Sequence, residues 1–216
     1  IALPMGLYAA TRPDSAIDHF CRGTITVSSA FPTFFVGLLL VFVFYYLLGW
    51  APQPVGRLDE MLHSPPARVT GFFLVDSLLA GDLETLRAAA AQLLLPSITM
   101  GLFVLAPIAR MTRASMLAVL SADFVRTARA SGLTRSTVLV TYALRNALLP
   151  VVTTLGMVFG FMLGSSVIVE RVFGWPGAGS YAIDALTASD YAPVQGFVLA
   201  MGILFAMMRS IHTHYG

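Results

Sequence analysis

Residues 146–169 read NALLPVVTTLGMVFGFMLGSSVIV, an apolar run without aspartate, glutamate, lysine or arginine. A bilayer core of about 30 Å is crossed by roughly 20 helical residues, and a charge at its centre costs about 2.5–3.5 kcal/mol on insertion scales. Arg145 precedes the run and Glu170 follows it. The stretch is therefore predicted to be a membrane-spanning helix. Further spans in the chain are located by the same criterion, an uncharged interval of sufficient length.

Three further uncharged intervals are long enough to cross a bilayer, namely residues 23–56, 88–109 and 191–208. The first is densest in apolar residues over Phe34–Trp50. The second contains Pro96 and Pro107, which membrane helices tolerate because neighbouring helices satisfy the freed carbonyls. Four such spans predict an all-α, polytopic membrane protein.

The opening segment Ile1–Ala10 is apolar but too short to span a bilayer. It has no basic n-region and no initiator methionine, so it is not interpreted as a signal peptide. We expect it to be the end of a helix whose front lies outside this chain. Residues 1–216 are thus predicted to form a single, N-terminally truncated transmembrane domain with about four full spans plus the end of another.

Composition excludes several kinds of chemistry. All 13 basic residues are arginine, so the chain has no lysine for a Walker A phosphate loop or a Schiff base. The spans hold only isolated serine and threonine, and no catalytic residue is predicted. The four histidines, His19, His63, His212 and His214, lack partner ligands, so no metal site and no cofactor are expected. The net charge of +2 is too small to indicate nucleic-acid binding.

The arginines also predict the orientation, because basic residues are retained on the cytoplasmic side of a membrane. With four alternating spans, residues 11–22, 110–145 and 209 onward share one side, with nine arginines against three aspartates. The other side carries four arginines against eight acidic residues. Residues 11–22 and 110–145 are therefore predicted to be cytoplasmic loops, and residues 51–91 and 170–190 external loops.

The 110–145 segment has the start and stop residues of helices rather than the composition of a linker. Ser121 or Asp123 can cap a helix over residues 124–131. Gly132 then occupies a position that favours a positive φ, and Thr134 offers a second cap for a helix leading into the next span. We therefore expect a short helix, a glycine turn and another helix.

Two roles fit the first of these helices. Phe124, Ala128 and Ser131 are expected on one face, while Arg126 and Arg129 pair on another. A stiff, partly apolar projection suits docking into a groove of a partner protein. An amphipathic helix lying on anionic lipid is an equal alternative on spacing alone, since each surface arginine gains about 1 kcal/mol there.

Several segments carry a family resemblance. Residues 123–133, DFVRTARASGL, and residues 142–153, YALRNALLPVVT, resemble the EAA loop of ABC-importer permeases of the binding-protein-dependent type. The dipeptide/oligopeptide (nickel) branch is the most similar, and residues 31–38, 56–57, 170–179 and 190–196 resemble it in the same order. Arg126 and Thr127 replace the Glu and Ala of the general EAA pattern, a change that the peptide branch shares. The ending Arg209–Gly216 departs from the family and is assigned no role.

The resemblance implies a type I ABC-importer transmembrane domain in a bacterial or archaeal cytoplasmic membrane, forming half of a pathway for short peptides. Nickel, glutathione or another small solute is the alternative cargo, and an ATP-independent channel or an intramembrane enzyme is less favoured. The implied partners are a second permease, two cytoplasmic ATPases that hold ATP and magnesium, an external substrate-binding protein and membrane lipid. The implied ATPase-coupling residues are Asp123, Phe124, Arg126, Thr127, Ala128, Arg129, Ala130, Ser131, Gly132 and Leu133.

Gly156, Gly160 and Gly164 recur at every fourth position of one span. Such a stripe of small residues lets another helix approach closely, whereas a pore lining would also keep side chains small. We favour helix packing within the subunit over a direct pore lining, because these stripes are a general device of membrane helix association.

Phe173, Trp175, Pro176 and Gly177 lie in a segment that resembles the external loop facing the binding protein. Its two aromatic residues fit an anchor at the membrane interface and a partner contact equally well. The long exposed segment 57–87 is expected to cap the pore mouth or to serve as a spacer.

Overall fold

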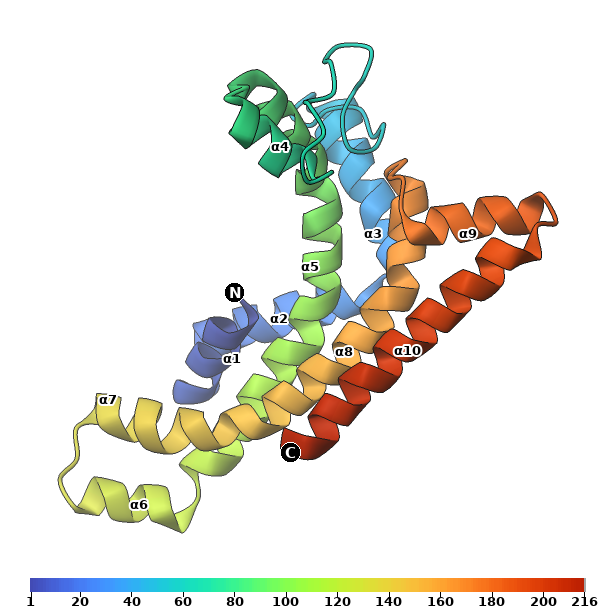
Figure 1. Cartoon of the computed structure of the whole chain (residues 1–216). Helices are drawn as coiled ribbons and strands as arrows, with labels where there is room; N and C mark the ends of the chain where they lie inside the picture. Colours follow the sequence, from blue (N-terminus) through green and yellow to red (C-terminus); the bar gives the residue numbers. More distant parts are fainter. Residues whose placement is uncertain (216) are drawn as a thin grey trace. The chain divides into compact units, whose positions relative to one another are not determined.

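The computed structural model describes the backbone of residues 1–215, with side chains described except at 208, 209 and 211–215. No β-strand occurs in that range, which confirms the all-α prediction. His212, His214 and most of the atypical ending lie outside the residues whose side chains are described. The elements (Figure 1) are α1 (Ala2–Thr11), α2 (Ala16–Ala30), α3 (Thr33–Leu40), the π-helical η1 (Val41–Leu47), α4 (Phe73–Ala80), α5 (Leu83–Leu120), α6 (Asp123–Ala130), α7 (Arg135–Thr137), the π-helical η2 (Val138–Leu144), α8 (Arg145–Val172), α9 (Ala178–Thr187) and α10 (Tyr191–Tyr215).

Two described helical stretches are long and apolar enough to cross a membrane: Leu83–Leu120 and Arg135–Val172, of 38 residues each. They contain the predicted spans 88–109 and 146–169 and extend both. A third crossing results if Ala16–Ala30 and Thr33–Leu47 are one broken span, and Tyr191–Met207 is a shorter apolar helix. An uncharged interval therefore marks the apolar centre of a helix and not its ends.

The predicted span 23–56 is not one continuous helix, because the helix is interrupted at Pro32, between α2 and α3. Phe31 is extended, with φ −114° and ψ 142°, the conformation that a following proline imposes. Pro32 then serves as the N-cap residue of α3, and its carbonyl accepts a hydrogen bond from the Val36 N–H at 3.2 Å. The apolar run continues through η1 but its helix ends at Leu47.

Much of the sequence predicted to form loops is also helical, because polar residues there cap the N-terminal ends of helices. Within residues 11–22, Ser15 caps α2 by accepting a hydrogen bond from the Asp18 N–H at 3.2 Å. Within residues 51–91, Asp82 accepts from the Thr85 N–H at 3.0 Å at the start of α5. Both helices therefore begin several residues before the uncharged intervals that predicted them.

The chain forms two compact units. The first comprises residues 1–31, 102–162 and 204–216, and the second comprises residues 32–101 and 163–203. In the first unit α1 packs tightly on α5, since a Cβ added at Gly6 would lie 2.6 Å from Thr112 Cβ. The buried side chains of Ala10, Met116, Ala143 and Ala147 form a core beside this contact.

In the second unit Leu95, Val169 and Phe173 form the buried core, with the aliphatic and aromatic side chains of α3 and η1 packed around it. Two glycines close the loops over this core. Gly56 donates its N–H to the Phe173 carbonyl at 3.0 Å, and a Cβ at Gly56 would lie 2.7 Å from the Gly174 carbonyl oxygen. Both glycines have positive φ, which a side chain would disfavour.

Candidate coupling site

The segment predicted to couple to a partner is a rigid hairpin in the first unit. In Figure 1, α6 runs back alongside the helix that begins with α7, and a short turn joins the two. Val125 and Ala128 of α6 are 0% and 5% exposed and pack with Val138, Val119 and Leu120. This apolar contact ties α6 to the end of α5 and to the start of η2, so the three elements form one packed body. We call residues 123–137 the coupling hairpin.

The structure contradicts the predicted cap of α6 and shows which of its faces is packed. The N-cap residue is Ala122, which has no side-chain acceptor, so neither Ser121 nor Asp123 caps the helix. The face that packs on the rest of the unit contains Val125 and Ala128, whereas Phe124 and Ser131 are exposed, so the face shared by Phe124, Ala128 and Ser131 is not the packed one. The packed face depends on where Val119, Leu120 and Val138 lie, and helical spacing within α6 does not contain that information.

The predicted turn after α6 is confirmed. Gly132 has φ +78°, and its N–H donates to the Arg129 carbonyl at 3.1 Å. Thr134 is the N-cap residue of the next helix and accepts a hydrogen bond from the Thr137 N–H at 3.3 Å. The hairpin therefore owes its tight connection to a left-handed glycine followed by a capping threonine.

The surface of the coupling hairpin is exposed and cationic. Nine of the ten predicted coupling residues are exposed, and Ala128 alone faces inward. Asp123 and Arg126 approach to 3.5 Å, but both are largely exposed, so this pair contributes only about 0–1 kcal/mol. Arg129 and Arg135 form no ion pair within the described part of the chain. The surface therefore retains positive charge that the described part of the chain does not neutralise.

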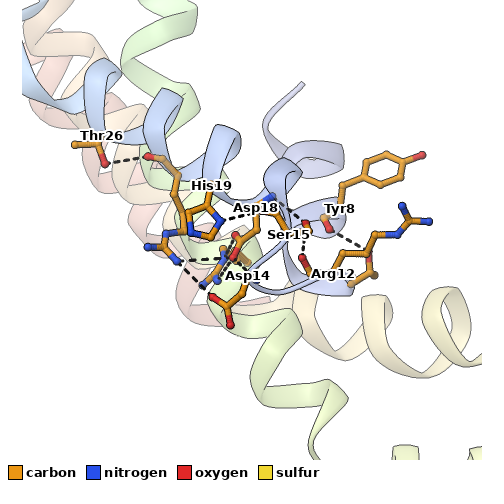
Figure 2. A network of polar contacts seen from close by, with 10 residues as sticks. Tyr8, Arg12, Asp14, Ser15, Asp18, His19 and Thr26 are labelled. Carbon is orange, nitrogen blue, oxygen red and sulfur yellow. Dashed lines mark hydrogen bonds and ion pairs between the residues drawn. The ribbon is translucent and has the colours of Figure 1, made fainter.

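A buried ion pair lies in the same unit, where α2 meets α5. Figure 2 shows Asp14, Ser15 and Asp18 gathered at the turn between α1 and α2. The Asp18 side chain is 0% exposed, and Arg113 donates to it through Nε at 2.7 Å and through Nη2 at 2.8 Å. Arg22 lies 3.8 Å from the same carboxylate. We call the Asp18–Arg113 pair the α2–α5 clamp.

The clamp was missed by sequence reasoning, which counted Asp18 and Arg113 only as charges in predicted cytoplasmic segments. The two residues are 95 positions apart, and the chain offers 13 arginines as partners. The available local signal was the i, i+4 spacing of Asp18 and Arg22. A bidentate carboxylate–guanidinium pair fixes orientation as well as distance, so the clamp holds the start of α2 in register with α5.

The glycine stripe of α8 has unequal surroundings. A Cβ at Gly160 would lie 2.6 Å from Phe205 Cε2 of α10 in the first unit. Gly164 is exposed and has no atom within 4 Å of such a Cβ, and Gly156 is partly buried. Close helix packing within the chain thus involves Gly160, while Gly164 presents an open surface among the described residues.

The predicted external segment is partly core. Phe173 is 3% exposed and packs on Leu95 and Val169, so it is not the exposed anchor or partner contact that the sequence suggested. Phe173 is buried because the loop through Gly56 folds over it. Trp175 is partly buried and Pro176 is exposed.

The end of α8 determines where α9 begins. The carboxylate of Glu170 accepts the Ser180 N–H at 2.7 Å, and Arg171 donates to Asp184 at 2.5 Å. Gly177 lies directly against the Glu170 carboxylate, where a Cβ would overlap it. The Glu170–Ser180 and Arg171–Asp184 contacts anchor α9 to α8, and sequence reasoning did not identify them.

Comparison with known proteins gives a consistent family. The family described as "Binding-protein-dependent transport system inner membrane component" matches residues 2–213. The chain is 40% identical over 97% of its length to the dipeptide transport system permease protein DppB of Escherichia coli K12, of which it covers 62%. It is 43% identical over 95% of its length to the di/tripeptide permease DppB of Pseudomonas aeruginosa UCBPP-PA14, of which it covers 60%.

A third relative has a different named cargo. The glutathione transport system permease protein GsiC of Escherichia coli O1:K1 / APEC is 39% identical over 87% of the chain, which covers 52% of that protein. The chain thus spans about three fifths of the length of the dipeptide relatives that it matches. These matches confirm the resemblance to permeases of the dipeptide branch and the assignment to a multi-pass protein of the cytoplasmic membrane.

Proposed function

Because the chain belongs to the family of binding-protein-dependent transport system inner membrane components, we propose that it forms half of the pathway of an ATP-driven importer of short peptides. Its expected assembly contains a second permease, two cytoplasmic ATPase subunits and an external substrate-binding protein. The names of the dipeptide and di/tripeptide relatives support the cargo. ATP hydrolysis belongs to the partner subunits in this proposal, in line with a chain that has no lysine.

The coupling hairpin is the observation that carries the proposal. Its eight-residue α6 is packed from one side through Val125 and Ala128 and exposed on the other. A helix held in this way moves as a body with the end of α5, so a push on its surface is passed on instead of being absorbed by bending. Arg126, Arg129 and Arg135 supply positive charge and planar, multidentate donors for an acidic groove on the ATPase.

The α2–α5 clamp extends this mechanical path. Arg113 lies two turns before the end of α5, which leads directly into α6. Its bidentate contact with the buried Asp18 carries a displacement of α5 into the start of α2. The proposed sequence is therefore ATPase closure, displacement of α6, displacement of α5, and rearrangement of the helices that line the pathway.

Site-directed crosslinking tests the coupling assignment. Ala130 is exposed on α6, whereas Ala128 faces inward, so the two alanines form a matched pair. In the assembled transporter, cysteine at Ala130 is expected to crosslink to an ATPase subunit, while cysteine at Ala128 and at the exposed Ala114 of α5 is not. Absence of any Ala130 crosslink in a complex that hydrolyses ATP and imports substrate would contradict the coupling role.

Glutathione is a second candidate cargo, which the similarity to a glutathione permease favours. Uptake assays with a labelled dipeptide and with labelled glutathione, each with the cognate binding protein, separate the two. Import that depends on both ATP and the binding protein supports the importer. Flux through the permease pair alone would instead indicate a passive channel, and product formation by the purified chain would indicate an intramembrane enzyme.

A further inference from the structure

The second unit contains a cavity of about 810 Å³ at the junction of η1, the loop after it and the first turns of α5. Small-molecule sites commonly occupy about 300–1,000 Å³, so this cavity is large enough for a ligand of two or three residues. It lies in the part of the chain predicted to be external, before the apolar centre of α5. Neither the coupling hairpin nor the α2–α5 clamp involves it.

The lining combines both signs of charge with an apolar wall. Glu84 and Arg87 lie three residues apart on α5, which places them on the same face with Cβ atoms about 5–6 Å apart. Arg87 forms no ion pair among the described residues, although an acid lies one turn away. Leu62, Leu83 and Ala91 supply apolar surface beside these charges.

Two further polar side chains, Gln92 and His63, belong to the wall of the cavity. Gln92 is only 7% exposed, and its amide Nε2 donates to the Gln53 carbonyl at 2.9 Å, which fixes the floor of the cavity. His63 presents Nε2 to Glu84 at 3.9 Å, while its Nδ1 is buried without a hydrogen-bond partner among the described residues.

We infer that this cavity binds a zwitterionic short peptide, with the ammonium group at Glu84 and the carboxylate at Arg87. The two termini of a dipeptide are at most roughly 7 Å apart, which matches two side chains one helical turn apart. The apolar wall accommodates small side chains. The inference deepens the proposed function, on which it rests, by giving the peptide a receiving site on the side predicted to be external.

Binding of dialanine to the purified protein in lipid nanodiscs tests the site. Titration calorimetry is run with dialanine, its N-acetyl derivative and its C-terminal amide, against wild type, Glu84→Gln and Arg87→Gln. Arg87→Gln is expected to weaken dialanine by up to about fivefold, the value of one exposed ion pair, and to leave the amide unchanged. Glu84→Gln is expected to weaken dialanine similarly and to leave the N-acetyl derivative unchanged.

Glu60→Gln and Arg68→Gln serve as charge-matched controls, since both residues are exposed in the same loop and outside the cavity. Absence of saturable dialanine binding, equal losses in the controls, or losses that do not depend on the blocked terminus would overturn the inference. ATP-driven peptide import with normal kinetics in both cavity variants would also overturn it and leave the proposed function standing. A complex that imports no peptide in any variant, while wild-type protein still binds dialanine with the expected end-group pattern, refutes the proposed function instead.

Discussion

Breaking the α2–α5 clamp from either side is expected to have unequal effects. Removing one partner of a fully buried ion pair typically costs about 3–5 kcal/mol, because the remaining charge is left uncompensated. The Asp18 carboxylate is 0% exposed, whereas the Arg113 side chain is 23% exposed and can reach water. Asp18→Asn is therefore expected to destabilise the first unit by about 2 kcal/mol, below that range, and Arg113→Met by about 3 kcal/mol or more.

The double variant Asp18→Leu/Arg113→Met removes both charges and is expected to recover most of the loss, since apolar replacements of buried pairs are often neutral. Unfolding of the wild type, Asp18→Leu, Arg113→Met and the double variant in a denaturing detergent titration gives the four corners of the cycle, and Asp18→Asn is measured beside them. Arg110→Met is the matched control, because Arg110 lies on the same helix and is exposed, and it donates to Ser29 at 3.1 Å without an ion pair among the described residues.

Import rates of the assembled transporter provide the second readout. If the clamp transmits displacement of α5, the double variant should regain stability without regaining coupling between ATP hydrolysis and import. A coupling free energy under about 0.5 kcal/mol between the two sites, or destabilisation by Arg110→Met equal to that of Arg113→Met, would refute the reasoning.

Three other outcomes are expected. Gly132→Ala should destabilise the coupling hairpin by about 1 kcal/mol because φ is +78°, and Gly132→Asn should cost less, as measured by proteolysis of the turn. Gly160→Ala should destabilise by about 1–3 kcal/mol through overlap with Phe205, whereas Gly164→Ala should be neutral in the isolated chain; equal effects in detergent unfolding would exclude this difference in packing. The Thr70 N–H, donating to Asp76 at 2.7 Å, holds the pKa of that carboxyl below its usual 3.8, so the protection factors of the amides in this loop, which are corrected for the intrinsic pH dependence of exchange, should be constant above about pH 5 and fall as the pH drops further; Asp76→Asn should abolish this pH dependence of the protection factors.

Local sequence rules succeeded where the deciding interaction lies within a few residues. Gly132 and Thr134 were identified because a left-handed turn and an N-cap each depend on one residue and its immediate neighbours. The helix interruption at Pro32 was missed, because the span was predicted from the absence of charge alone. Proline restricts the residue before it, and Phe31 is extended here. The length of an uncharged interval reflects the free-energy cost of inserting charges into a bilayer. It carries no information on whether the helix is continuous.

The sequence did not identify buried side chains where the surface that covers them comes from another element. Within α6, helical spacing allowed several apolar faces, and contact with Val138 selected the one containing Val125 and Ala128. The segment around Phe173 is rich in glycine and proline and suggests a surface aromatic, yet the loop through Gly56 buries it. Burial of a side chain depends on every segment that covers it, and most of these are distant in sequence.

The sequence by itself determined the all-α membrane fold, the absence of a lysine for ATP chemistry, the glycine turn of the coupling hairpin and the family. These features follow from composition, from runs of like residues and from motifs, which are local quantities. Only the tertiary structure decided that Asp18 pairs with Arg113, that Glu170 anchors α9, and that Glu84 and Arg87 line one cavity with His63. Those pairings depend on the approach and register of helices, and a single arginine or glutamate in a sequence has many partners that would satisfy its charge equally well.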